Sequence, residues 1–189
     1  MVKSELILKT IISLMETTPY NQIKVSRITE EAGISRSTFY FYFKTVQDAV
    51  DELEDNFIQG IYDEADAVSR IRNYTFNHKS FSEMLTPTIH YVGTHLHEFR
   101  VLSGPNGDPA FHEKLTERMR NMYYALYTTV FEKTSVESEL SIAMLASIQW
   151  GIYCCWAENS DRISEADVTA YLSKVLVLLD ESGFLNQNN

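Results

Sequence analysis

The stretch that decides the fold runs from residue 25 to residue 43 and reads Val-Ser-Arg-Ile-Thr-Glu-Glu-Ala-Gly-Ile-Ser-Arg-Ser-Thr-Phe-Tyr-Phe-Tyr-Phe. Its pattern predicts one short helix around Ser26–Ala32 and a second from about Ser35 to Phe43. Gly33 lies between them, where a helix end or tight turn requires the left-handed backbone that glycine adopts without strain. Two short helices joined by such a turn are typical of a helix-turn-helix, whose second helix enters the major groove of DNA.

The second helix mixes hydroxyl, aromatic and arginine side chains. We expect five apolar residues to hold the two helices together: Ile28, Ala32, Ile34, Phe39 and Phe43. Four others are left for solvent or a partner: Arg36, Ser37, Tyr40 and Tyr42. Hydroxyl groups donate hydrogen bonds to phosphate, and Arg can donate a pair of bonds to a guanine edge. Lys44 precedes the next helix, where its charge and the positive helix end would act on one phosphate. The alternative is a solvated, Tyr-rich helix surface.

The run from Ile28 to Val50, read with its neighbours, resembles the signature of the tetracycline-repressor (TetR/AcrR) family of regulators. The resemblance covers about residues 5–55 and rests on Ala32-Gly33, Ser35, Thr38, Tyr40, Phe43-Lys44 and Asp48 in order. It implies that the second helix reads an operator, that Tyr40, Tyr42 and Lys44 hold phosphates, and that Arg36 approaches bases. The expected DNA-binding residues are Ser26, Ser35, Arg36, Ser37, Thr38, Tyr40, Tyr42 and Lys44.

Two positions depart from the family pattern. Val25 stands where the family often has a Thr that caps the first motif helix and touches phosphate, so Ser26 would have to supply that contact. Val46 stands where Lys is common, which removes one charge near the DNA. Both departures predict somewhat weaker nonspecific affinity.

The rest of the chain shows helical spacing and predicts an all-α fold of about nine helices. Thr45 with Asp48, Thr134 with Glu137, and Ser164 with Asp167 resemble caps at the starts of helices. Thr86-Pro87 predicts the start of a helix whose apolar positions are Ile89, Val92, Leu96 and Phe99. Asp108-Pro109 predicts the start of another, with Phe111, Leu115, Met119, Met122 and Leu126 as its stripe. We expect a helix-turn-helix domain at residues 1–47 and a helical ligand-binding and dimerisation domain at residues 48–189.

Residues 140–157 carry no charged side chain, which raises the possibility of a membrane span. Glu139 and Glu158 bound the stretch where basic anchors would be expected, so we interpret it as a helix buried on all sides inside a protein. The family resemblance extends weakly to this helix and the last one, which in such regulators commonly form a four-helix interface. That resemblance implies a homodimer.

Six residues are candidates for lining a small-molecule pocket: Phe99, Met119, Met122, Tyr123, Trp150 and Tyr153. Apolar residues with this helical spacing more often belong to a solid hydrophobic core than to a ligand pocket. The family resemblance favours a cavity. His90, His95, His97 and His112 cluster in sequence, but surface or cavity histidines are a commoner outcome than a metal site. The sequence has no Glu with His three residues later and no HExxH, GxSxG, P-loop or GxGxxG pattern, so we expect no enzyme, metal or cofactor.

The net charge of −10 argues against a nucleic-acid partner until its distribution is considered. Residues 1–50 hold six basic and five acidic residues, whereas residues 51–189 hold ten and twenty-one. Any DNA-facing surface should therefore be N-terminal. The two cysteines, Cys154 and Cys155, are adjacent and suit a reducing cytoplasm, and no signal peptide is expected.

The sequence as a whole predicts a ligand-responsive transcriptional regulator, a repressor that binds a palindromic operator in double-stranded DNA as a homodimer. Its small-molecule effector is unknown. The alternative is a coregulator or activator of the same fold that acts mainly through a protein partner. Operator binding by the purified chain alone would separate the two.

Overall fold

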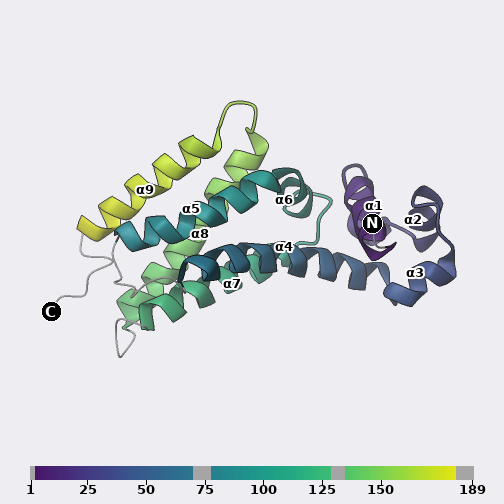
Figure 1. Cartoon of the computed structure of the whole chain (residues 1–189), viewed down its shortest axis with the longest axis horizontal. Helices are drawn as coiled ribbons and strands as arrows, with labels where there is room; N and C mark the ends of the chain where they lie inside the picture. The colour runs from purple at the N-terminus through teal and green to yellow at the C-terminus, as the bar shows by residue number, and fades with distance from the viewer. Residues whose placement is uncertain (1–2, 70–77, 129–134, 182–189) are drawn as a thin grey trace. The chain divides into compact units, whose positions relative to one another are not determined.

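The computed structural model describes residues 3–69, 78–128 and 135–181, and within those ranges it contains helices and no strand. The chain divides into two packing units, the first made of residues 1–59 and 97–111 and the second of residues 60–96 and 112–189. The elements (Figure 1) are α1 (Lys3–Met15), η1 (Tyr20–Gln22), α2 (Val25–Glu31), α3 (Arg36–Tyr42), α4 (Val46–Ser69), α5 (His78–Thr94), α6 (Leu96–Leu102), α7 (Ala110–Thr128), α8 (Val136–Glu158) and α9 (Glu165–Glu181). The all-α prediction is confirmed. The division into functional domains between residues 47 and 48 stays a prediction, because the packing units have other boundaries and describe contacts, not function.

The turn between α2 and α3 forms as the sequence predicts. Gly33 has φ +62°, the left-handed region. The N–H of Ile34 donates to the carbonyl of Thr29 at 3.0 Å, and the N–H of Gly33 donates to that of Glu30 at 3.3 Å. These two bonds form a Schellman motif, which satisfies carbonyls at the end of α2 and stops the helix.

The start of α4 is fixed by a reciprocal cap. The N–H of Asp48 donates to the Thr45 hydroxyl at 3.0 Å, and the N–H of Thr45 donates to the Asp48 carboxylate at 3.1 Å. Ser164 and Asp167 make the same exchange before α9. The cap before α8 is made by Ser135 with Ser138, and Thr134, which the sequence paired with Glu137, lies outside the described residues. Ser138 takes the acceptor role because its hydroxyl lies 2.8 Å from the N–H of Ser135.

The first packing unit also includes the segment that follows α5. Phe99 of α6 packs with Phe57 of α4 and Phe111 of α7, at ring-centroid distances of 5.8 and 6.2 Å. The N–H of Tyr20 donates to the carbonyl of Asn106 at 2.8 Å, which ties the loop after α6 to the loop after α1. Residues about forty to ninety positions apart in the sequence thus lie together in one unit.

Two helix boundaries differ from the sequence prediction. Pro87 lies inside α5 and does not begin it, because Leu85, Ile89 and Val92 are buried on both sides of the proline and their packing keeps the helix continuous. The apolar residues from Ile89 to Phe99, which the sequence assigned to one helix, lie on two. Ile89 and Val92 are in α5, whereas Leu96 and Phe99 are in α6.

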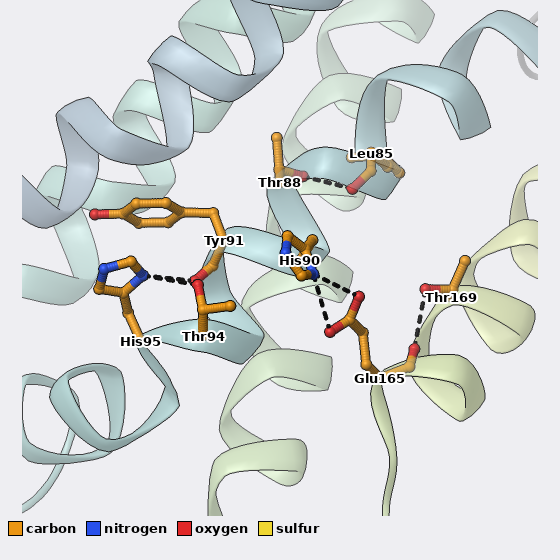
Figure 2. A network of polar contacts seen from close by, with 8 residues as sticks. All are labelled: Leu85, Thr88, His90, Tyr91, Thr94, His95, Glu165 and Thr169. Atoms are coloured by element: carbon orange, nitrogen blue, oxygen red, sulfur yellow. Dashed lines mark hydrogen bonds and ion pairs between the residues drawn. The ribbon is translucent and has the colours of Figure 1, made fainter.

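Two side-chain hydrogen bonds accompany the break between α5 and α6. The Thr94 hydroxyl and the Nδ1 of His95 both donate to the carbonyl oxygen of Tyr91, at 2.9 Å each (Figure 2). The same carbonyl also accepts the N–H of His95 at 3.1 Å, and α5 ends at Thr94 while α6 begins at Leu96.

The second packing unit is built around α5, α8 and α9, with α5 and α9 side by side (Figure 1). His90 of α5 bonds through Nδ1 to the Glu165 carboxylate at the start of α9, at 3.0 and 3.3 Å (Figure 2). A Cβ at Gly93 would lie 2.8 Å from the Trp156 ring, so glycine permits the close approach of α8 to α5.

The helix α8 is long and apolar enough to cross a membrane by length and composition alone. One of its faces is buried in the second unit through residues such as Leu145, Tyr153 and Trp156. Val136 and Leu140 on the opposite face are exposed in the single chain. The expectation of a helix buried on all sides is therefore not met by this chain alone, because no other element of its described part covers that face.

Candidate functional site

The helix α3 is held from inside by its aromatic residues. Phe39 and Phe43 are buried, and their rings lie 5.9 Å apart. Ile28 of α2 is also buried, as the sequence predicts for the residues that join the two helices. The opposite side of α3 therefore presents its side chains outward in a fixed orientation.

Two of the expected DNA-binding hydroxyls take part in the cap of α3. Ser35 is the N-cap, and its Oγ accepts the N–H of Thr38 at 3.1 Å. The hydroxyls of Ser37 and Thr38 lie 2.8 and 2.9 Å from the same Oγ. Ser35 and Thr38 thus stabilise the start of the helix. Each hydroxyl can make a further hydrogen bond to a partner, because a hydroxyl has one hydrogen and two lone pairs.

The other expected residues of this helix are exposed together. Arg36, Ser37 and Lys44 are exposed, and Tyr40 and Tyr42 are 56% and 37% exposed. Successive residues of an α-helix are separated by about 100°, so Tyr40 and Tyr42 point to opposite flanks of the outward face. Two phenols placed on the flanks of a helix suit contacts to backbone phosphates on either side of a groove.

Ser26 is exposed in the first turn of α2, and the carbonyl of Ser26 accepts the Thr29 hydroxyl at 3.0 Å. The N-cap of α2 is Lys24, which makes no side-chain capping bond. This agrees with the departure at Val25, where the resembling family often has a capping Thr.

Sequence reasoning missed Phe41, the most exposed large apolar side chain in the described part of the chain at 81%. The signal was available, because Phe41 stands two residues from both Phe39 and Phe43. That spacing turns it about 200° away from the core face.

The expected pocket residues do not all lie in one unit. Phe99 belongs to the aromatic core of the first unit, whereas the others lie on α7 and α8 in the second. Met119, Met122, Tyr123 and Tyr153 are buried, and Trp150 is half-buried with its ring centroid 4.6 Å from that of His112.

A buried polar chain connects two of these residues. The Tyr123 hydroxyl donates to Oε1 of Gln149, and Nε2 of Gln149 donates to the Tyr153 hydroxyl at 2.7 Å. Burial raises the pKa of Tyr123 well above 10.0, and burial also raises that of Tyr153. Both phenols therefore remain neutral, with Tyr123 donating to Gln149 and Tyr153 accepting from it. Nothing in the sequence pattern pointed to Gln149.

Two other clusters were candidates. The four clustered histidines contact different groups: His90 bonds to Glu165, His95 to the carbonyl of Tyr91, His97 to Glu16, and His112 lies against Trp150.

Carboxylate oxygens of Asp51, Glu54 and Asp108 lie within 4.8 Å of one another in the first unit, and Gln47 donates to Asp51 and Asp108 at 3.2 and 2.9 Å. A cavity of about 290 Å³ in the same unit is lined by Met15, Glu16, Arg100, Val101, Gly104, Pro105 and Asn106, none of them an expected pocket residue.

Residues 7–52 match the tetR family of bacterial regulatory proteins. A comparison with curated proteins finds no match. Among solved structures, the fatty acid degradation regulator FadR from Bacillus halodurans is 17% identical, with a TM-score of 0.66 over 100% of this chain and 97% of that one. FadR from Bacillus subtilis in complex with stearoyl-CoA is 16% identical, with a TM-score of 0.64 over 98% and 99%. A TerR/AcrR-family regulator from Aquifex aeolicus VF5 is 15% identical, with a TM-score of 0.67 over 94% and 99%. At these identities the likeness concerns the fold.

Proposed function

Since the chain belongs, through residues 7–52, to the tetR family of bacterial regulatory proteins, we propose that it is a ligand-responsive repressor that binds a palindromic operator as a homodimer. Proteins of this family are DNA-binding regulators and not enzymes. The observation that carries the proposal is the outward face of α3, where Arg36, Ser37, Tyr40 and Lys44 are exposed together within the matched region.

Arg36 and Lys44 have different proposed roles. Arg36 is in the first turn of α3, where its guanidinium can reach a base edge, and Lys44 follows the helix, where it can reach only the backbone. Arg36→Ala should cost about 1 to 3 kcal/mol per half-site on the correct base and little on a wrong one. Lys44→Ala should weaken all sequences alike and lower the salt slope by roughly one per half-site.

Binding of both variants to a selected operator and to scrambled DNA across a salt series tests this assignment. Equal losses on both DNAs for Arg36→Ala would show that Arg36 only positions the protein. Base reading would then have to pass to Ser37 or Tyr40.

A homodimer would cover apolar side chains that the single chain leaves in water. Leu140 of α8 and Leu178 of α9 are each 65% exposed, and Val136 and Tyr171 on the same two helices are also exposed. A two-fold symmetric interface uses the same surface from both copies, so these exposed residues of one chain can pack against the same residues of a second chain. Two recognition helices would then lie about 34 Å apart, which requires a palindromic operator.

Sedimentation at micromolar concentration tests the dimer. The chain should sediment as a dimer, and the double variant Leu140→Glu with Leu178→Glu as a folded monomer. Asn21→Glu, at an exposed position in η1, is the control and should remain dimeric. A monomeric unmodified chain would contradict the proposal.

We place the effector site in the second unit, among the side chains of Met119, Met122, Tyr123, Trp150 and Tyr153, and leave out Phe99, which packs in the aromatic core of the first unit. The stearoyl-CoA complex of FadR from Bacillus subtilis supports an apolar effector, because it has the same fold. Coupling between effector and DNA is typically about 1 to 3 kcal/mol, a factor of roughly 5 to 150 in affinity. Met122→Trp should fill the site and abolish effector-dependent release of the operator while leaving operator binding intact.

The second candidate is a coregulator that acts through a protein partner, from the cytoplasm as the repressor would. Operator selection with the purified chain separates the two. Enrichment of a palindrome favours the repressor, and no enrichment favours the coregulator.

A further inference from the structure

The recognition helix exposes an aromatic side chain that has no role in the proposal above. Phe41 of α3 is 81% exposed, more than Tyr40 or Tyr42 beside it. The buried residue of this helix is Phe39, and Phe41, two residues further on, points about 200° away from it. Ser37 lies one turn earlier on the same outward line, so these two residues form the centre of the outward face.

The ring of Phe41 is held in place although it is exposed. It packs edge-on against the ring of Tyr42, at a centroid distance of 4.9 Å and an interplanar angle of 87°. Tyr42 in turn lies 6.5 Å from the buried ring of Phe43. This chain of rings connects Phe41 to the core, so ordering it on binding costs little conformational entropy.

The surroundings of Phe41 favour DNA over a protein partner. Residues 24–44 hold four basic and two acidic residues, in a chain whose net charge is −10. Phe41 itself has no hydrogen-bonding group and cannot hold a phosphate as a Tyr can. Among the base edges in the major groove, only thymine presents an apolar group, its 5-methyl.

We propose that Phe41 is a specificity-determining residue that contacts the 5-methyl group of a thymine in each half-site of the operator. This inference rests on the proposed function, since it requires the outward face of α3 to enter the major groove. Phe41 then selects thymine by apolar contact, while Arg36 and the flanking phenols supply polar contacts.

The test removes the methyl group without changing base pairing. An operator is first selected from random duplexes with the full chain, and each thymidine is then replaced by deoxyuridine. Dissociation constants are measured for the unmodified chain, Phe41→Ala and Phe41→Leu. Thermal unfolding of both variants checks that they fold, as expected for a side chain that is 81% exposed.

We expect deoxyuridine at one thymine to weaken binding of the unmodified chain about fourfold for each half-site that carries it, which corresponds to about 0.8 kcal/mol for each methyl group withdrawn from apolar contact. Phe41→Ala should lose this sensitivity at that position alone, and Phe41→Leu should retain part of it. Thymines elsewhere in the operator serve as the matched control.

Two results overturn the inference, and they are distinguishable. If the operator is bound but no thymine shows the effect, or Phe41→Ala keeps it, Phe41 does not read thymine and the proposed function stands. If no duplex is enriched, operator binding itself fails and the inference fails with it.

Discussion

Replacing Gly33 with Ala isolates the energetic cost of a single backbone conformation. Gly33 has φ +62°, and a Cβ placed there would meet no atom within 4 Å. The substitution therefore creates no clash, and its effect comes from the backbone alone. A left-handed conformation costs an L-residue roughly 1 to 2 kcal/mol, and the lower entropy of the unfolded Ala chain returns about 0.4 to 1 kcal/mol.

The free energy of unfolding of the first packing unit should fall by about 0.8 kcal/mol in Gly33→Ala, the difference between the midpoints of these two ranges. Gly33→Asn is the matched control, because Asn tolerates the left-handed region better than other residues with a side chain. It should lose less stability than Ala.

Hydrogen exchange of the Ile34 amide is the sharpest assay, since that N–H donates to the Thr29 carbonyl across the turn. Its protection should fall about fourfold in Gly33→Ala, the factor that corresponds to the same energy. Far-ultraviolet circular dichroism in urea gives the global value. Tryptophan fluorescence is unsuited, because Trp150 and Trp156 both lie on α8 in the second unit. An Ala variant as stable as the original chain, or an Asn variant as damaged as Ala, would refute the reasoning.

Three further predictions concern the second unit. Gln149→Leu should destabilise it by about 1 to 3 kcal/mol, because buried phenols lose a hydrogen-bond partner, and the loss measured by urea unfolding should be smaller in a Tyr123→Phe background. Since burial raises the pKa of Tyr123 and Tyr153 above 10.0, their neutral forms stabilise the fold fully below that pH. Stability should fall as pH rises above it, and phenolate absorbance of these two should appear only with unfolding; ionisation in the folded protein would contradict this. The hydrogen bonds from Ser164 lower the pKa of Asp167 below 3.8, so their contribution is present above that pH and is lost as pH falls through the lowered value. In Ser164→Ala, a carboxyl titration by NMR should find the pKa of Asp167 moved up toward 3.8, and an unchanged value would rule out this cause.

The sequence by itself determined the features that depend on neighbours within about five positions. The left-handed turn at Gly33 and the caps at Thr45 and Ser164 were predicted correctly, because each is completed by donors and acceptors on the same short segment. The outward face of α3 follows from helical spacing around Phe39 and Phe43, and the same spacing would have identified Phe41.

Only the tertiary structure decided where long-range packing overrides a local signal. Pro87 is a strong local sign of a helix start, yet buried neighbours on both sides keep α5 continuous through it. Phe99 looks like part of one stripe with Ile89 in sequence, but it packs with Phe57 and Phe111 in the other unit. The hydrogen bond between Tyr123 and Gln149 joins residues on two different helices that are 26 positions apart in the sequence, so no local pattern could reveal it. Apolar burial and buried hydrogen bonds depend on which surfaces meet, and that is set by the whole fold and not by the spacing of residues along one helix.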